Sequence, residues 1–178
     1  MKGNTNHMFF VFLGTLLLSV SFAQTKQEQI KIIRKKFEVI NKDTTLKKVV
    51  LENEEFLEDM TDGGGELTGF YKGKEIKKIY EWIGLSNGIS IKEFYFDKGQ
   101  LIFVFEKFDS FVFDDKRNEL NHNKSKTIFE GRYYFNDRKL ISKLTKGDKS
   151  LAAQDESTEK GLLKRSSETL ARLNKKSK

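Results

Sequence analysis

The chain contains no cysteine, and only two of its 178 residues are histidine. The missing thiols exclude a thiol enzyme, a thiol-anchored lipoprotein and a metal site with cysteine ligands. They also mean that no disulfide can support the fold. The chain must therefore be held together by an ordinary hydrophobic core.

Arginine is scarce although the chain is basic. The formal charge is +7, from 33 Lys and Arg against 26 Asp and Glu, and only six of the basic residues are arginine. Arginine is the side chain suited to planar, bidentate contacts with phosphates and bases, so we expect no nucleic-acid partner. A lysine-rich surface favours solubility, or weak attraction to anionic surfaces of the cell envelope.

The N-terminus has the three-part pattern of a secretory signal peptide. Lys2 supplies a positive charge, Met8–Val20 is an uncharged and mostly apolar run, and small residues stand at Ser21 and Ala23. This pattern predicts a signal peptide over 1–23 and export to the periplasm or the outside of the cell. The run is short for a membrane span, and no stop-transfer segment follows it.

The 155 residues that follow suit one domain. We expect a single α+β domain over 24–146, then a polar linker and a basic, helical tail over 147–178. Thr25–Lys42 predicts an amphipathic helix because its apolar residues recur at steps of three and four. Those residues are Ile30, Ile33, Phe37 and Ile40.

Runs of β-branched and aromatic residues predict the strands. They cover 47–52, 66–71, 75–83, 89–96, 100–108, 126–135 and 139–144. Leu101–Phe105 is apolar on both faces and should be a central strand covered on both sides. The polar segment Asp114–Ser125 is expected to be an exposed loop. The expected fold class is α+β, with the N-terminal amphipathic helix packed on a curved antiparallel β-meander of about six or seven strands, and with a C-terminal helix.

Three segments repeat one pattern: two aromatic residues, a polar turn and an aliphatic residue. They are Phe70–Ile76, Tyr95–Leu101 and Tyr134–Leu140. We expect each to be a β-hairpin, with a type I turn followed by Gly99 at positive φ in the second. Arg138 replaces that glycine in the third, so its turn should differ or carry strain.

The tail has a broken apolar stripe. Leu162, Leu163, Leu170 and Leu173 form it, and Ser166-Ser167 interrupts it. We therefore expect the tail helix to pack weakly, and truncation after Ser150 to leave the domain folded. Its seven basic residues predict weak attraction to anionic envelope surfaces.

Catalytic candidates are few. His122 is the only histidine after the signal peptide, and it lies between two asparagines in a polar segment, so we expect neither catalysis nor a metal site there. The acidic pairs are Glu54-Glu55, Glu58-Asp59 and Asp114-Asp115. Two carboxylates at a suitable separation can hydrolyse a glycosidic bond, but neighbours on one strand point to opposite faces. No catalytic residue, cofactor or metal is predicted.

The aromatic residues carry the remaining signal. Most should form the core, but alternation along the strands sends some to the other face. Tyrosine and tryptophan suit a partly exposed surface because they combine a large apolar area with a polar tip. The candidate binding residues are Tyr71, Tyr80, Trp82, Tyr95 and Tyr134. The leading hypothesis is an exported, non-enzymatic module that binds a protein, peptide or glycan through its sheet. The alternatives are a small hydrolase with paired carboxylates and an envelope-associated structural protein.

Overall fold

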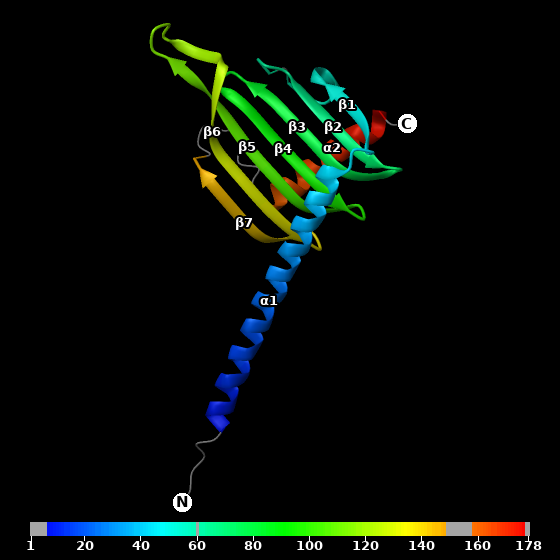
Figure 1. The fold of residues 1–178 in the computed structure, drawn as a ribbon, viewed down its shortest axis with the longest axis vertical. Coiled ribbons are helices and arrows are strands. Elements are labelled where there is room, and N and C mark those ends of the chain that lie inside the picture. Colours follow the sequence, from blue (N-terminus) through cyan, green and yellow to red (C-terminus); the bar gives the residue numbers. More distant parts are fainter. Residues whose placement is uncertain (1–6, 60, 149–157, 177–178) are drawn as a thin grey trace, which may run out of the picture.

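The structure, a computed structural model, describes residues 7–59, 61–148 and 158–176, with side chains from Thr25 onward. In this part of the chain the fold is α+β, with one seven-stranded antiparallel sheet and two α-helices (Figure 1). The helices are α1 (His7–Lys42) and α2 (Glu159–Lys176), and a short 3₁₀ helix covers Asn53–Glu55. The strands are β1 (Lys47–Glu52), β2 (Gly65–Lys72), β3 (Glu75–Leu85), β4 (Gly88–Asp97), β5 (Gln100–Asp114), β6 (Glu119–Asn136) and β7 (Lys139–Gly147).

The strand order in the sheet is the order in the chain, β1 to β7, so the expected meander is confirmed. β1 has the predicted bounds, and the other strands contain the predicted ones and extend beyond them. Each neighbouring pair is antiparallel, as short turns require.

The loop predicted over Asp114–Ser125 is wrong. β5 runs to Asp114 and β6 starts at Glu119, so these strands form a hairpin that extends beyond its neighbours (Figure 1). Both faces of a projecting two-stranded arm meet water, so its residues are polar without being a loop. Phe111 and His122 pack against each other across the arm, with ring centroids 4.6 Å apart and the rings tilted by 58°.

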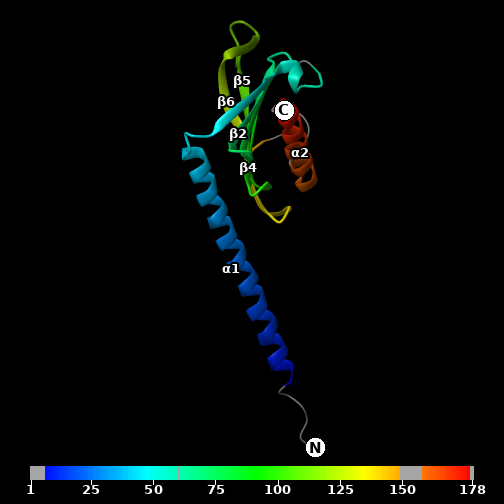
Figure 2. The same cartoon turned by 90° about the vertical axis from the view of Figure 1, so that its right-hand side faces the viewer.

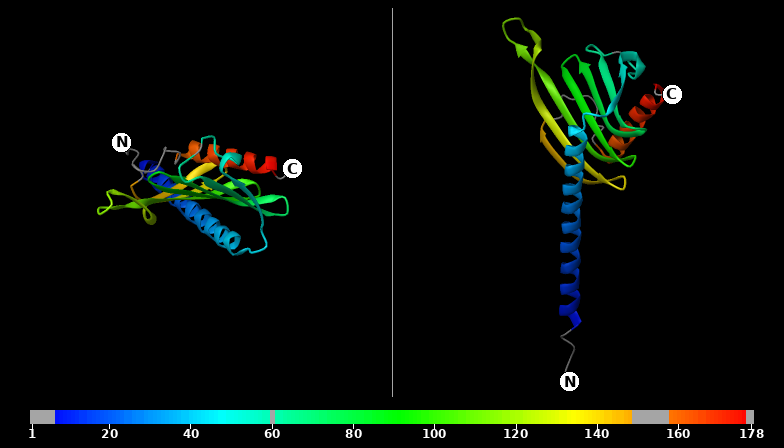
Figure 3. Two further views of the ribbon diagram at one scale, coloured as in Figure 1. Left: turned by 90° about the horizontal axis from the view of Figure 1, so that it is seen from above. Right: turned by 45° about the vertical axis from the view of Figure 1, so that its right-hand side comes forward.

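The two helices lie on opposite faces of the sheet (Figures 2 and 3). We call these the α1 face and the α2 face. The core on the α1 face consists of Ile30, Ile33, Tyr95, Phe103 and Tyr134. The larger core on the α2 face includes Leu67, Ile79, Phe94, Val104, Tyr133, Phe135, Leu162 and Leu173. Because Phe103 belongs to one core and Val104 to the other, the prediction that this strand is covered on both sides is confirmed.

The expectation that the tail helix packs weakly is wrong. Leu162 and Leu173 of α2 are fully buried, and Ser166 and Thr169 are 4% and 1% exposed. The Ser166 hydroxyl donates to the Leu163 carbonyl oxygen at 2.9 Å, and the Thr169 hydroxyl donates to the Arg165 carbonyl oxygen at 2.9 Å. A hydroxyl satisfied within its own helix can be buried at little cost. The interruption in the apolar stripe is therefore part of the contact surface. The linker expected before this helix lies mostly outside the described residues.

The hairpin turns differ from the predicted type. Lys98 and Gly99 both have positive φ, 49° and 74°, and so do Asp137 and Arg138, at 49° and 63°. Two central residues with positive φ are typical of a type I′ turn, whose twist matches the flanking strands. Arg138 adopts this conformation although it is not glycine. The strain expected at this position therefore comes from its positive φ, which brings its Cβ close to the following carbonyl oxygen.

Candidate binding surface

The structure separates the five predicted aromatic residues. Tyr71 lies in the core of the α2 face and is 9% exposed. Tyr95 and Tyr134 lie in the core of the α1 face, at 0% and 3% exposed. Tyr80 and Trp82 are half-buried, and their alternation along β3 places them on the α1 face as well. Four of the five therefore share a face, and the two on β3 keep exposed surface there. Binding by any of them stays a prediction.

Carboxylates surround the two β3 aromatics. Tyr80 pairs with Thr68 on β2 and Glu93 on β4, and Trp82 pairs with Glu66 and Ile91. Burial raises the pKa of the Tyr80 hydroxyl, and the negative charges of Glu93, Glu66 and Asp109 raise it further. The phenol therefore stays protonated and can donate a hydrogen bond at neutral pH.

A cavity of about 400 Å³ lies between α1 and the α1 face. Its apolar lining is mostly aromatic: Phe37, Phe103, Phe105 and Tyr134, with Ile33. Its charged lining is Arg34 and Glu38 from α1, Glu93 from β4 and Arg132 from β6. Concave sites of this size, largely apolar with a few polar groups, are typical of small-molecule binding.

Both arginines lie close to aromatic rings. The Arg34 Nε donates to the Tyr134 hydroxyl oxygen at 3.3 Å, and its guanidinium carbon lies 5.6 Å from the centre of the Tyr134 ring. The guanidinium carbon of Arg132 lies 5.2 Å from the centre of the Phe105 ring. These cation–π contacts hold the two guanidinium groups beside aromatic rings that line the cavity.

Glu93 is already engaged. Lys78 Nζ lies 2.9 Å from one carboxylate oxygen, and the Tyr95 hydroxyl donates to the other at 2.5 Å. Burial raises the pKa of the Tyr95 hydroxyl, and the neighbouring charge of Glu93 adds to the effect. Tyr95 therefore remains a hydrogen-bond donor, and Glu93 serves as an acceptor within this network.

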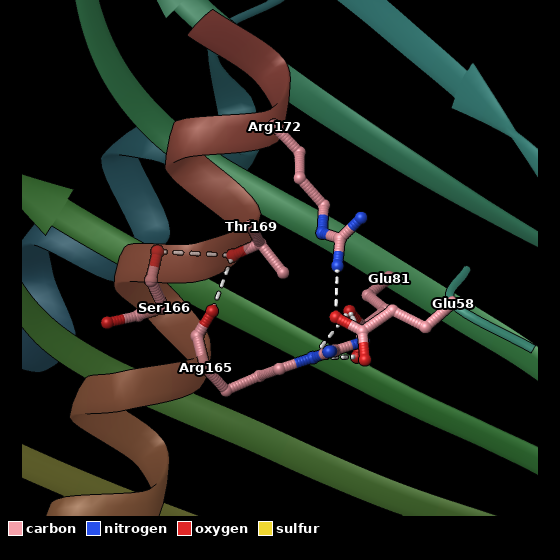
Figure 4. Close-up of polar contacts among 6 residues, drawn as sticks. All are labelled: Glu58, Glu81, Arg165, Ser166, Thr169 and Arg172. Atoms are coloured by element: carbon pink, nitrogen blue, oxygen red, sulfur yellow. Dashed lines mark hydrogen bonds and ion pairs between the residues drawn. The ribbon is translucent and has the colours of Figure 1, made fainter. Parts of the chain in front are cut away.

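The α2 face contains a row of buried charges that sequence reasoning missed. Glu81, Lys92 and Glu106 are cross-strand neighbours on β3, β4 and β5, and they are 2%, 9% and 4% exposed. Tyr133 donates to Glu106 at 3.0 Å, and Arg165 of α2 donates to Glu81 (Figure 4). Strand alternation alone puts Glu81 on the same face as the core residue Ile79, so the signal was present in the sequence.

The predicted acidic pairs lie at the surface, and two of their members bind α2. Lys176 pairs with Glu55 at 2.5 Å, and Arg172 pairs with Glu58 at 2.7 Å (Figure 4 shows the second pair). These carboxylates thus hold the helix. In the part of the chain that the structure describes, no group of three His, Asp or Glu residues could hold a metal ion.

One further motif is excluded by its setting. Gly84-Leu85-Ser86-Asn87-Gly88 fits the G-x-S-x-G pattern of a hydrolase nucleophile, which requires a strand, a sharp turn and a helix. Here Ser86 and Asn87 form the turn between the antiparallel strands β3 and β4. The serine therefore has no nucleophile-elbow geometry.

Comparisons with known proteins give no relative: no family model, no curated protein and no solved structure matches the chain. Among the described residues, neither helix contains an apolar stretch long enough to cross a membrane. The site geometry therefore carries the functional argument.

Proposed function

We propose that the protein is an exported, non-enzymatic module that binds a protein, peptide or glycan on its α1 face. The observation that carries the proposal is the arrangement of Tyr80 and Trp82. They lie half-buried on a face where the α1 core is formed by other residues, and the aromatic cavity opens on the same face. Tyrosine and tryptophan supply much of the binding energy in many interfaces.

Export rests on the signal peptide over 1–23. The residues with which α1 packs on the sheet begin at Ile30, so cleavage after Ala23 leaves these contacts in the mature chain. Intact-mass measurement of protein recovered outside the cytoplasm should give a chain that starts at Gln24. A mass that retains residues 1–23 would instead mean an anchored protein.

Binding is favoured over hydrolysis by the state of the cavity carboxylates. A hydrolase with paired carboxylates needs one that can act as an acid and one that can act as a base or nucleophile. Glu93 is held in an ion pair with Lys78 and by the Tyr95 hydroxyl, which leaves Glu38 without a second free carboxylate beside it in the lining.

The tail should attract anionic envelope surfaces only weakly. Four of its basic side chains already pair with carboxylates of this chain: Lys164, Arg165, Arg172 and Lys176. Paired charges contribute less to attraction than free ones, and salt screens what remains. Co-sedimentation with anionic vesicles should therefore be weak and should vanish at high salt.

Trp82 allows a direct test, because it is the only tryptophan in the chain. Its fluorescence reports on the proposed surface without a label. Fractions of an envelope extract should be titrated into the full chain, and fractions that shift the emission should be analysed by mass spectrometry. We expect at least one saturable shift, and we expect Tyr80→Ala to weaken it.

Phe113→Ala is the matched control. Phe113 is 51% exposed and lies near the end of the β5–β6 arm, beyond Ser110, where the pairing of β5 with β4 ends, so its truncation removes an exposed aromatic ring outside the region of Tyr80. The proposal fails if Tyr80→Ala and Phe113→Ala bind as the unchanged protein does, or if no fraction shifts the emission.

A further inference from the structure

We propose that the cavity beside α1 binds a carboxylate attached to an apolar body, and that Arg34 and Arg132 hold the carboxylate. This inference rests on the proposed binding function and names the chemistry of its ligand. A free small carboxylic acid and the C-terminus of a peptide with an apolar last residue share this chemistry.

Arg34 is available to an anion. It lies on α1 one turn before Glu38, and among the described residues its guanidinium donates only through Nε, to the Tyr134 hydroxyl oxygen. In the described part of the chain, no carboxylate forms an ion pair with it. A guanidinium has five N–H donors, so most of the donors of Arg34 can still meet a carboxylate.

Arg132 supplies the second cation from a different element. Its Nη1 contacts the Glu130 carboxylate on the same strand at 3.2 Å, with the two side chains 44% and 31% exposed. Exposed ion pairs of this kind are weak, so a bound carboxylate can compete for the same group. One arginine from α1 and one from β6 thus line the same cavity.

The apolar part of the ligand is indicated by the aromatic lining. Tyr134 and Phe103 have ring centroids 5.0 Å apart, and Phe37 meets Phe103 edge-on at 5.3 Å. An apolar group bound against these rings removes their surface from water, which favours binding. A small inorganic anion would leave the same rings exposed to water.

Glu38 should oppose an anion and so gives the proposal a second, opposite test. It lines the cavity, is exposed and forms no ion pair within the described residues. Replacing it with glutamine removes a negative charge near the bound carboxylate without changing the shape. Binding should therefore become tighter.

The probe acid is 3-phenylpropionate, and its uncharged match is 3-phenylpropanamide. A ligand of this size should bind with a dissociation constant of about 1 mM or somewhat lower. Amide NMR shifts of the full chain, assigned to residues of β4, β5 and β6 at the cavity, should follow the titration. We expect the amide to bind roughly tenfold or more weakly, because it loses the charge-assisted bonds.

Variants locate the contact. Arg34→Gln and Arg132→Gln should each weaken binding of the acid by about tenfold and leave binding of the amide nearly unchanged. Arg117→Gln is the matched control, since Arg117 lies in the β5–β6 turn with its side chain 72% exposed. Glu38→Gln should strengthen binding of the acid a few-fold. Melting temperatures verify that each variant is folded.

Two peptides separate the sources of the carboxylate. A short peptide ending in phenylalanine with a free carboxylate should bind more tightly than the same peptide amidated if the ligand is a peptide terminus. Binding of the acid alone assigns the site to free acids.

Equal binding of acid and amide would overturn the inference while leaving an apolar site, and with it the proposed function, intact. Absence of any shift at the cavity overturns the inference as well. The Trp82 titration then decides the proposed function separately.

Discussion

Arg165 on α2 and Glu81 on β3 form an ion pair across the buried interface between helix and sheet. Nη2 and Nε of Arg165 donate to one carboxylate oxygen of Glu81 at 2.7 and 3.0 Å (Figure 4). The Glu81 side chain is 2% exposed and the Arg165 side chain 19%. A buried carboxylate needs such a partner, because its desolvation otherwise costs several kcal/mol.

Arg165→Met should therefore destabilise the protein by about 3 kcal/mol, since it leaves the buried Glu81 carboxylate without the guanidinium. Chemical denaturation measures the change in the free energy of unfolding. The double variant Glu81→Met with Arg165→Met should recover part of the loss, because it also removes the buried carboxylate that Arg165→Met leaves without its guanidinium.

Arg172→Met is the matched control. Arg172 lies on the same helix and pairs with Glu58 at 2.7 Å, but the Glu58 side chain is 84% exposed. Its removal should change the free energy of unfolding by less than about 1 kcal/mol. Equal effects of the two methionine variants would mean that burial of the Glu81 pair does not contribute to stability.

The packing of α2 predicts a second difference between matched variants. Leu173 is fully buried in the core of the α2 face, whereas Leu144 on β7 is 50% exposed. Leu173→Ala should cost about 2–5 kcal/mol, and Leu144→Ala about 0.5 kcal/mol or less. Truncation after Ser150 should for the same reason abolish cooperative unfolding, contrary to the expectation from the broken stripe. A truncated chain with an unchanged thermal melt would show that α2 is dispensable.

The turn between β6 and β7 predicts a stabilising change. Arg138 has a φ of 63°. Arg138→Gly removes a conformational cost of about 1–2 kcal/mol but adds about 0.5–1 kcal/mol of chain entropy, so the gain should be about 0.5–1 kcal/mol. Gly99→Ala tests the same physics in reverse, because a Cβ there would meet nothing within 4 Å and only its φ of 74° opposes it. It should cost about 1 kcal/mol. A rise in melting temperature in both variants would contradict this account.

The spacing of apolar residues and the local composition predicted the strands well, because each strand either alternates between apolar and polar residues or is continuously apolar. The meander followed from short turns between neighbours. The spacing of apolar residues could not predict that Ser166 and Thr169 are buried. Their hydroxyls donate to carbonyl oxygens of their own helix, and these bonds leave no trace in the pattern of apolar residues. Nor could polarity distinguish the projecting β5–β6 arm from a loop.

The candidate site was only partly predictable for a similar reason. Aromatic composition indicated Tyr80 and Trp82 among five candidates, but only the register of the strands shows that these two share a face with Tyr95 and Tyr134. The cavity needs Arg34 and Arg132, which lie about one hundred residues apart in the chain and line it together only because α1 packs against β6. No local pattern connects a helix residue to a strand that far along the chain.

The last prediction concerns acid stability at the end of α1. The Asp43 carboxylate accepts hydrogen bonds from the Thr45 hydroxyl at 2.6 Å, the Thr45 amide at 2.9 Å and the Lys72 ammonium at 2.9 Å. The Thr45 hydroxyl, followed by Lys72 and the Thr45 amide, lowers the pKa of Asp43 from 3.8 to about 2. NMR titration of the carboxyl carbon measures this value directly.

A carboxyl whose pKa is lower in the folded state stabilises that state when it is ionised. The contribution of Asp43 should therefore be complete above pH 3.8 and should disappear as the pH falls to about 2. Asp43→Asn lacks this titration, so the difference in melting temperature between it and the unchanged protein should shrink over that interval. Lys72→Met removes one of the bonds and should return the pKa of Asp43 part of the way to its ordinary value. A difference that stays constant from pH 5 to pH 2 would show that these contacts do not act on the ionised form.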